Sequence, residues 1–357
     1  MVDRRDRIVA EIWGRLQAAF VTGCMNANSS EPRKTKASAT KLVSGDRRAL
    51  AKAITLVESR RAKDQTEATA LVNAMLPHAG RAIRVGLSGA PGVGKSTFIE
   101  ALGTWLIGQG RRVAVLAVDP SSRRSGGSIL GDKTRMVKLA QQPHAFIRPS
   151  PAGATLGGVA RRTREAMLLV EAAGFDVVLV ETVGVGQSET AVADMVDMFI
   201  VLVSPGGGDE LQGIKRGIME LADLVVVTKA DGDLHQAATR AGAEYRAALH
   251  LMRPKFSDWS ADVRLVSSTL GSGIAEVWGD VEAFRKRLQA SGAWEKQRRD
   301  QRVAWLWSEL REGLLAFLTD DPAIAEELPR LEAQVAAGEI SPAAAARVLL
   351  AHRTAKT

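Results

Sequence analysis

The fold is decided by one short stretch of sequence, Gly89-Ala90-Pro91-Gly92-Val93-Gly94-Lys95-Ser96. It fills every fixed position of the phosphate-binding pattern G-x-x-x-x-G-K-[ST]. The apolar run 83–87 before it predicts a strand, and residues 97–102 after it predict a helix, which is the context that the pattern requires. Glycines let backbone N–H groups turn toward phosphate oxygens, and a helix start favours an anion. We therefore predict a P-loop that includes Thr97, with Lys95 on the β- and γ-phosphates and Ser96 on Mg²⁺.

Strand-like and helical segments alternate between residues 81 and 280. Apolar runs predict strands at 83–87, 113–118, 177–180, 198–203, 224–227 and 263–266. This alternation predicts an α/β fold, a three-layer P-loop NTPase domain whose mostly parallel sheet is covered by helices on both faces. Ligands of such sheets bind at the carboxyl ends of the strands. The polar motifs of this region follow strand ends, which predicts a single shared site.

Helices are expected on either side of this α/β domain of residues 81–280. Residues 41–80 show apolar residues at helical spacing and form an N-terminal helical segment. Residues 1–40 are expected to be a variable, flexible extension in which Met25 is an alternative start. Residues 281–357 are helical and charged, with an apolar stripe along one helix face.

Composition excludes several classes of protein. The net charge is +8, but the basic pairs are scattered and one Tyr leaves little aromatic surface for stacking bases, so we expect no nucleic-acid partner. No apolar run reaches about 18 residues, and the start of the chain lacks a signal-peptide pattern. A single cysteine, Cys24, excludes an intrachain disulfide. These features predict a cytoplasmic protein without a membrane partner.

A base-reading element follows the predicted strand 224–227. Thr228-Lys229-Ala230-Asp231 is close to the N/T-K-x-D element of G proteins, in which the aspartate accepts from two donors of guanine that adenine does not offer. Thr228 stands where Asn is usual, which puts some loop-anchoring bonds in doubt. A second, looser candidate for the base loop follows the strand 263–266: Ser267, Ser268 and Thr269. The sequence thus predicts GTP and GDP as ligands.

Carboxylates after two other strands are candidates for ordering Mg²⁺ together with Ser96. Asp119 and Glu181 come at strand ends, and Asp132 lies in a polar segment between the strands. Glu181-Thr182-Val183-Gly184 has the form of a D-x-x-G switch with Glu in place of Asp, so the Gly184 amide is expected at the γ-phosphate. We name no general base, because Gln187 lies beyond the usual position of a water-orienting residue; Asp119 is the candidate for positioning the water. We expect slow hydrolysis, because the sequence supplies no obvious transition-state cation beyond Lys95.

Five longer motifs resemble the MeaB/ArgK-type GTPases, which are chaperones of adenosylcobalamin-dependent acyl-CoA mutases. The resemblance covers residues from about 43 to the C-terminus and rests on Asp119-Pro120-Ser121-Ser122, Gly126-Gly127-Ser128-Ile129-Leu130-Gly131-Asp132-Lys133-Thr134-Arg135-Met136, Phe146-Ile147-Arg148-Pro149-Ser150-Pro151, Glu181-Thr182-Val183-Gly184-Val185-Gly186-Gln187-Ser188-Glu189-Thr190 and Gly208-Asp209-Glu210-Leu211-Gln212-Gly213-Ile214-Lys215. It implies that the protein is a homodimer held by its C-terminal helices. It also implies a GTPase that gates delivery of adenosylcobalamin to a mutase. The mutase is implied to hold that cofactor and to activate the hydrolysis of GTP.

The resemblance also implies roles for loops that respond to the nucleotide. Asp119 and Asp132 belong to a first switch, Glu181 to a second, and Lys215 to a third that signals to the mutase. We count Gln187 and Asp209 among these switch residues. The target is implied to be methylmalonyl-CoA mutase or a relative that acts on isobutyryl-CoA or 2-hydroxyisobutyryl-CoA, with the cobalamin-binding domain as docking surface.

Alternatives from other classes remain open at this point. A P-loop kinase would transfer the γ-phosphate to an acceptor, for which the sequence has no recognisable motif. A metal-insertion GTPase of similar fold would need clustered His and Cys, whereas the histidines are dispersed along the chain. Charge-driven nucleic-acid binding would show as a salt-sensitive shift of DNA.

Overall fold

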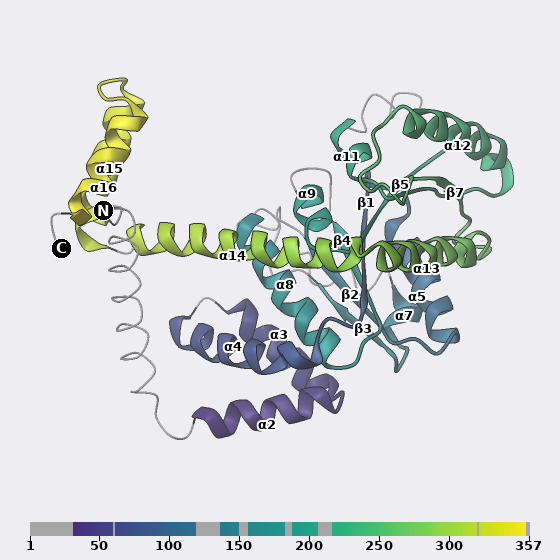
Figure 1. Ribbon diagram of the computed structural model, residues 1–357, viewed down its shortest axis with the longest axis horizontal. Helices are drawn as coiled ribbons and strands as arrows, with labels where there is room; N and C mark the ends of the chain where they lie inside the picture. Colours follow the sequence, from purple (N-terminus) through teal and green to yellow (C-terminus); the bar gives the residue numbers. More distant parts are fainter. Residues whose placement is uncertain are drawn as a thin grey trace, which may run out of the picture.

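The computed structural model describes residues 31–59, 61–118, 136–149, 156–182, 188–205, 216–319 and 321–354. Within these ranges a seven-stranded sheet forms the centre of the molecule (Figure 1). Its strands, in chain order, are β1 (Ile83–Gly89), β2 (Val113–Val118), β3 (Ala145–Arg148), β4 (Val177–Thr182), β5 (Met198–Val203), β6 (Leu224–Val227) and β7 (Val263–Leu265).

The strands lie in the order β3-β2-β4-β1-β5-β6-β7, and every pair of neighbours is parallel. β1 is central, with β4 on one side in the register Leu87↔Glu181 and β5 on the other in the register Gly89↔Leu202. The carboxyl ends of all these strands therefore face one edge of the sheet. The predicted doubly covered, parallel α/β architecture is confirmed.

Helices cover both faces because the strand residues alternate between two hydrophobic cores. Val177 and Leu179 belong to one core, and Val178 and Val180 to the other. The first core includes residues of the helices α5 (Lys95–Gly108), α7 (Val137–Ala140) and α13 (Ile274–Ser291). The second includes residues of α8 (Leu156–Ala172), α9 (Ser188–Ala193), α11 (Arg216–Leu221) and α12 (His235–His250). Two single-turn 3₁₀ helices, η1 (Leu76–His78) and η2 (Gly232–Leu234), complete this part.

Three N-terminal helices extend the second core. They are α2 (Glu31–Val43), α3 (Arg47–Glu58) and α4 (Ala62–Met75), and Figure 1 shows them grouped below α8. Asp46 begins α3, where its carboxylate accepts hydrogen bonds from the N–H groups of Arg48 and Ala49 at 2.8 and 3.0 Å. Such a cap satisfies donors that a helix start leaves unpaired. Leu50 and Ile54 then fall on one face of α3 and are fully buried.

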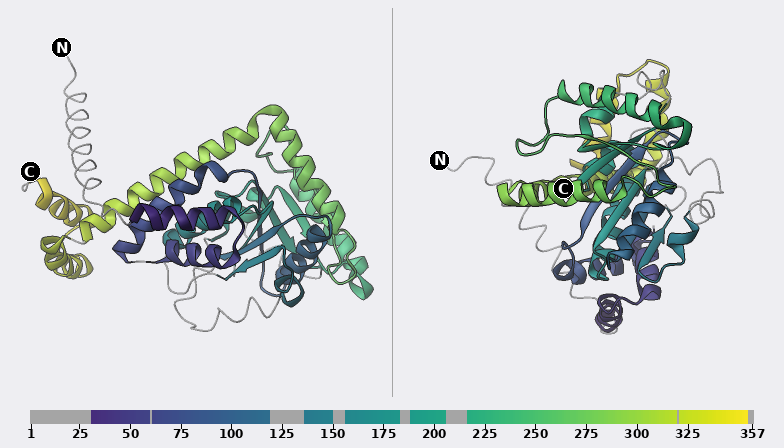
Figure 2. Two further views of the ribbon diagram at one scale, coloured as in Figure 1. Left: turned by 90° about the horizontal axis from the view of Figure 1, so that it is seen from below. Right: turned by 90° about the vertical axis from the view of Figure 1, so that its right-hand side faces the viewer.

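A long helix leads away from the sheet. α14 (Ala293–Thr319) runs past α8 and carries α15 (Pro322–Ala336) and α16 (Pro342–Thr354) at its far end, as Figure 1 and the left view of Figure 2 show. We call these three helices the arm. Within the arm, α14 exposes large apolar side chains, which are Val303, Leu306, Trp307, Leu310, Leu314 and Leu315. No described helix combines the length and the apolar character that a membrane span demands.

Four strand predictions need correction. β1 was expected to end at Leu87 and continues to Gly89, whereas β7 was expected to reach Val266 and ends at Leu265. β3 was not predicted, because it is only four residues long, lies at the sheet edge and ends in Arg148, which pairs with Glu58 of α3. β4 was expected to end at Val180 but continues through Thr182. Glu181 is thus part of the strand and is 4% exposed, because both neighbouring strands pair with it. Charge misled the prediction for β4, since a buried carboxylate looks like a strand end in sequence.

Candidate nucleotide site

The P-loop connects β1 to α5 at the carboxyl edge of the sheet. Gly92 and Gly94 have φ angles of 79° and 98°, in the left-handed region that favours glycine. A side chain at Gly89 would collide with the carbonyl oxygen of Leu202 on β5. The motif glycines are therefore required by this backbone path, which brings the start of α5 to the edge of the sheet at Lys95.

Two lysines bind back onto the P-loop. Lys95 Nζ lies 2.5 Å from the carbonyl oxygen of Gly89 and 3.3 Å from that of Ala90. Lys229 Nζ donates to the carbonyl oxygen of Gly92 at 2.9 Å. The ammonium group of Lys95, which belongs to the motif, and that of Lys229, which follows β6, thus both contact carbonyl oxygens of the P-loop. A phosphate group would be a stronger acceptor for Lys95 than a neutral carbonyl, since charge-assisted bonds are about twice as strong.

Ser96 and Glu181 meet beside the P-loop. Ser96 Oγ lies 3.4 Å from Glu181 Oε1, and the Glu181 side chain comes from the end of β4. Thr182, its neighbour, is buried and donates to Ser88 Oγ of β1 at 3.0 Å. A hydroxyl and a carboxylate are the hard oxygen ligands that Mg²⁺ takes, so these two side chains fit a magnesium site. Thr97, the next residue of α5, is exposed.

The Thr228–Asp231 segment follows β6 and contacts the P-loop directly. Thr228 Oγ1 lies 2.6 Å from the carbonyl oxygen of Val93 and 3.1 Å from that of Val203. Thr228 is 2% exposed. Lys229 adopts a left-handed backbone with φ of 54°. A threonine hydroxyl therefore does anchor this segment, although the sequence left the loop-anchoring bonds of the Asn position in doubt.

Asp231 is held in place by the loop that follows β7. Its Oδ2 accepts hydrogen bonds from Ser267 Oγ and, at 2.9 Å, from Thr269 Oγ1. The donors Ser267 and then Thr269 lower the pKa of the Asp231 carboxyl below its ordinary value. Ser267 is buried, whereas Ser268 is half-buried and Thr269 is exposed. Asp231 is thus ionised at neutral pH and lies at the same edge as Lys229.

The structure brings part of the predicted site together. The P-loop, Glu181, the Thr228–Asp231 segment and the Ser267–Thr269 loop all follow or end parallel strands at one edge of the sheet. The remaining predicted residues, Asp119, Asp132, Gly184, Gln187, Asp209 and Lys215, lie outside the described residues.

Sequence reasoning missed two buried hydroxyls of this edge. Ser88 and Thr182 are both 0% exposed and join β1 to β4 directly beneath the P-loop. Their signal was a polar residue inside an apolar run, one position before Gly89 and one position after Glu181. Buried hydroxyls need hydrogen-bond partners, so a hydrogen bond between two such residues on adjacent strands could have been predicted from the sequence.

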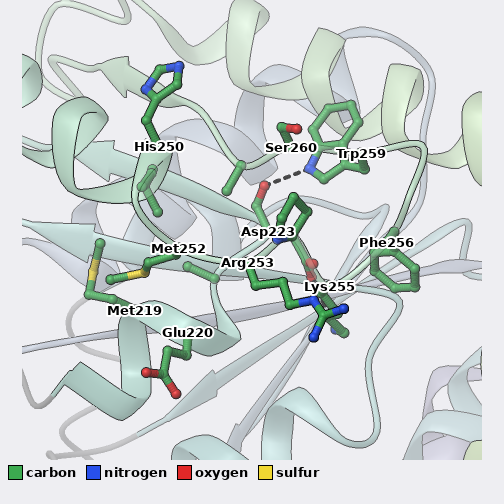
Figure 3. A pocket seen from close by; sticks show the side chains of 14 residues that line it. Met219, Glu220, Asp223, His250, Met252, Arg253, Lys255, Phe256, Trp259 and Ser260 are labelled. Carbon is green, nitrogen blue, oxygen red and sulfur yellow. Dashed lines mark hydrogen bonds and ion pairs between the residues drawn. The ribbon is translucent and has the colours of Figure 1, made fainter.

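A cavity lies at the opposite end of β6, away from this edge. It has a volume of about 230 Å³ and is lined by Asp223, which precedes β6, and by side chains after α12 (Figure 3). Burial raises the pKa of Asp223 to about 6, although Lys255 lies 3.5 Å away and Phe199 N–H donates at 2.8 Å. Because β6 separates it from Thr228, this cavity is not part of the candidate nucleotide site.

Comparison with known proteins identifies close relatives. A family model described as "Methylmalonyl Co-A mutase-associated GTPase MeaB" matches residues 50–323. A Caulobacter vibrioides protein is 56% identical over 311 residues, 87% of this chain and 95% of its own length. "GTPase ArgK" of Escherichia coli is 52% identical over 278 residues, 78% of this chain and 84% of that protein. "Methylmalonic aciduria type A homolog, mitochondrial" of Mus musculus is 50% identical over 321 residues, 87% of this chain and 77% of that protein.

A solved structure has the same architecture. The crystal structure of "LAO/AO transport system kinase" superposes with a TM-score of 0.73 at 41% sequence identity. The match covers 92% of this chain and 99% of that one. The likeness therefore extends over nearly the whole of both chains.

Proposed function

This chain belongs to the MeaB family of GTPases, and we propose that it gates the delivery of adenosylcobalamin to an acyl-CoA mutase and protects that mutase. The chain is itself a GTPase that binds guanine nucleotides. The cofactor adenosylcobalamin belongs to the partner in this proposal. Methylmalonyl-CoA mutase, the enzyme in the family's description, is the first candidate partner, with the isobutyryl- and 2-hydroxyisobutyryl-CoA mutases as relatives.

One observation carries the nucleotide part of the proposal. The hydroxyl of Thr228 binds the P-loop carbonyl of Val93, so a guanine-reading segment and a phosphate-binding loop are held at a fixed spacing. In our proposal Asp231 accepts from guanine while Lys229 lies along the purine, and Lys95 neutralises the terminal phosphates. Residues 89–97, Gly184 and the loop of Ser267, Ser268 and Thr269 complete the nucleotide contacts.

Ser96, Asp119, Asp132 and Glu181 are proposed to hold Mg²⁺. When bound, the ion would neutralise charge on the β- and γ-phosphates. The contact between Ser96 and Glu181 supports this assignment for two of the four residues. Asp119 is proposed to position the attacking water. Hydrolysis is expected to be slow without the mutase, because the sequence motifs supply no obvious transition-state cation beyond Lys95.

Signalling to the mutase requires loops that differ between the GTP and GDP states. We assign this role to Asp119, Asp132, Glu181, Gln187, Asp209 and Lys215; of these, Glu181 lies at the end of β4, and the others lie outside the described residues. The mutase must bind the two states with different affinity, since otherwise hydrolysis passes no signal.

The arm is proposed to form a homodimer through residues 281–357. Its exposed apolar residues, which include Leu306, Leu310 and Leu314, support this role because so large an apolar face is unusual on a monomer. In the same division of the chain, residues 81–280 form the GTPase domain, residues 41–80 a helical segment, and residues 1–40 a variable extension. The expected flexible extension needs correction from residue 31 onward, because α2 (Glu31–Val43) crosses this boundary and buries Ala39 in the second core. We place the protein in the cytoplasm, without nucleic-acid or membrane partners.

A pull-down tests the partner assignment. Tagged full-length protein is incubated with the cobalamin-binding domain of each candidate mutase, once with GDP and once with a non-hydrolysable GTP analogue. We expect one mutase to bind, with an affinity that differs between the two nucleotides. Binding to none of them in either state would contradict the chaperone role and leave the GTPase intact. Labelled γ-phosphate recovered on an acceptor rather than in water would favour a kinase instead.

A further inference from the structure

A cavity of about 320 Å³ lies at the base of the arm, between α8, the end of η1, the start of β1 and α14. We call it the arm-base cavity. Its lining includes Arg84 at the start of β1, which places it at the sheet edge opposite the P-loop. Its volume is at the lower end of the range for ligand sites, roughly 300–1,000 Å³. It is therefore large enough for a small organic molecule and separate from the nucleotide site.

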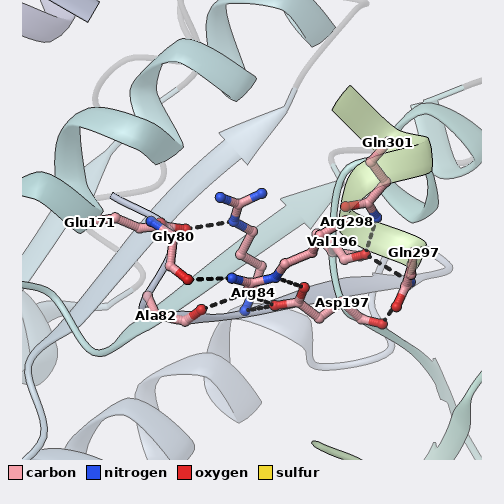
Figure 4. Close-up of polar contacts among 9 residues, drawn as sticks. All are labelled: Gly80, Ala82, Arg84, Glu171, Val196, Asp197, Gln297, Arg298 and Gln301. Carbon is pink, nitrogen blue, oxygen red and sulfur yellow. Dashed lines mark hydrogen bonds and ion pairs between the residues drawn. The ribbon is translucent and has the colours of Figure 1, made fainter. Parts of the chain in front are cut away.

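The wall of the cavity carries an excess of positive charge. Four arginines line it, which are Arg84, Arg164, Arg298 and Arg302, against one carboxylate, Asp194. Two of these arginines form ion pairs with carboxylates outside the cavity lining (Figure 4). Arg84 Nε lies 2.5 Å from Glu171 Oε1, and Arg298 Nε and Nη2 lie 2.7 Å from Asp197 Oδ1 and Oδ2.

The other two guanidinium groups, Arg164 and Arg302, make no hydrogen bond or ion pair with any residue that the structure describes. Arg164 is half-buried, and burial lowers its pKa even though Asp194, Glu309 and Glu312 favour its charged form. Glu309 does not line the cavity and is itself bound by Arg161 at 3.1 Å and by Trp305 Nε1 at 2.9 Å. Arg164 therefore has a desolvation cost that its surroundings do not offset.

Apolar side chains form the rest of the wall. Leu76, Met167, Met195 and Trp305 line the cavity beside the arginines. Methionine side chains adapt their shape, and the flat indole of Trp305 can cover a hydrocarbon chain. A ligand that fits these walls needs a hydrocarbon part as well as an anionic group.

We propose that the arm-base cavity binds a small organic monocarboxylate with a short apolar chain. Arg164 and Arg302 donate to the carboxylate as planar forks, and Asp194 is the one carboxylate in the lining. The chain lies against Met167, Met195 and Trp305. The occupant touches α8 and α14 together, so it fixes the base of the arm against the sheet domain. This proposal does not depend on the nucleotide site or on the mutase.

Fluorescence quenching of the full-length protein by 6-bromohexanoate tests the proposal, because bromine quenches a tryptophan that it contacts. We expect saturable quenching with a dissociation constant on the order of 1 mM, as suits so few ligand atoms. Hexanoate should compete for the site. Hexanamide, which has the same shape without the charge, and inorganic phosphate, which lacks the chain, should not. Trp305→Phe should abolish the quenching while calorimetry still detects hexanoate, which assigns the signal to this cavity.

Arginine variants separate the site from general electrostatics. Arg164→Gln and Arg302→Gln should each weaken hexanoate binding about tenfold, since each removes a charge-assisted bond. Arg299→Gln is the matched control, because Arg299 lies on the same helix, is exposed and does not line the cavity. Its binding should equal that of the wild type, and thermal unfolding should show that all three variants are folded.

Four results would overturn the proposal. They are the absence of saturable quenching, equal binding of hexanamide, competition by phosphate as strong as that by hexanoate, and loss of affinity in Arg299→Gln that matches the loss in Arg164→Gln. The last two results would show that hexanoate binding reflects a general attraction of anions to a basic chain rather than a site in this cavity.

Discussion

The hydroxyl oxygen of Thr228 lies 2.6 Å from the backbone carbonyl oxygen of Val93, which joins the segment after β6 to the middle of the P-loop. The two residues are 135 positions apart in the chain. A movement of the P-loop on nucleotide binding should therefore shift the segment that carries Asp231. This link is the structural basis for treating phosphate binding and base selection as one event.

Removing this link should weaken nucleotide binding. Thr228→Val keeps the shape of the side chain but leaves the buried carbonyl of Val93 without that donor, which costs on the order of 1–2 kcal/mol. We expect about tenfold weaker binding of GDP by calorimetry. Thr239→Val is the control, since its hydroxyl bonds only within α12, and it should bind GDP as the wild type does. Equal affinity of Thr228→Val and the wild type would contradict the link.

Asp231 should decide the preference for guanine. Asp231→Asn loses the charge that accepts two guanine donors, so its preference for GDP over ADP should fall about tenfold or more. Competition of both nucleotides against a fluorescent GDP measures this ratio. Asp233→Asn, two residues further along in η2, should leave the ratio unchanged. Unchanged discrimination in Asp231→Asn would remove this residue from base reading.

The arm is held to the sheet by a buried ion pair. Arg298 of α14 binds both carboxylate oxygens of Asp197 and also the carbonyl oxygens of Gly80 and Ala82 at 2.5 and 2.6 Å (Figure 4). Asp197 is 0% exposed and also accepts from Arg84 N–H at 2.8 Å. Gln297 and Gln301 of α14 donate to the carbonyl oxygens of Asp197 and Val196 at 3.0 and 2.6 Å.

Breaking this pair should destabilise the fold strongly. Arg298→Met leaves the Asp197 carboxylate buried without its counter-charge, so the free energy of unfolding should fall by about 3–5 kcal/mol. Urea denaturation measures the change. The double variant with Asp197→Asn should recover part of the loss, because the buried charge is then gone. Arg299→Met, on the exposed side of α14, should change stability by less than about 0.5 kcal/mol. If Arg298→Met lowers the free energy of unfolding no more than Arg299→Met does, the stabilising role of the Arg298–Asp197 ion pair is refuted.

Asp223 should make stability depend on pH. Its folded pKa of about 6 lies above the unfolded value of about 3.9, so the unfolded state loses its proton first as the pH rises. The contribution of Asp223 to stability is therefore present below pH 4 and is lost between about pH 4 and 6. The loss approaches about 3 kcal/mol for a two-unit shift.

Asp223→Asn tests this sign. The variant lacks the titration, so its free energy of unfolding relative to the wild type should rise from pH 4 to pH 6 and then stay constant. Urea denaturation at intervals across this range measures the difference. Asp258→Asn, in the exposed loop before Trp259, should show no such trend. A difference that falls as the pH rises would show that Lys255 outweighs burial.

The sequence was sufficient for the sheet and the P-loop because their signals are local. Long apolar runs predict buried parallel strands, and the glycines of the P-loop meet a backbone requirement that few residues satisfy. β1, β2, β5 and β6 were predicted from such runs. β3 was not, because four residues ending in Arg148 give too little periodicity to recognise.

Contacts between distant segments could not be read in this way. Asp197 and Arg298 are 101 positions apart, and each has the appearance of an ordinary surface charge in sequence. Likewise, the contact of Ser96 with Glu181 follows from the strand register, which only the folded sheet defines. The anchoring role of Thr228 was in doubt for the same reason, since its acceptor lies in another loop.

Calorimetric titration with guanine nucleotides tests the central claim most directly. Full-length protein is titrated with GDP and with a non-hydrolysable GTP analogue in the presence of Mg²⁺, and with ADP as the comparison. The account predicts one binding site for guanine nucleotides and affinity for ADP that is about 100-fold weaker. No heat with either guanine nucleotide, or equal binding of GDP and ADP, would contradict it.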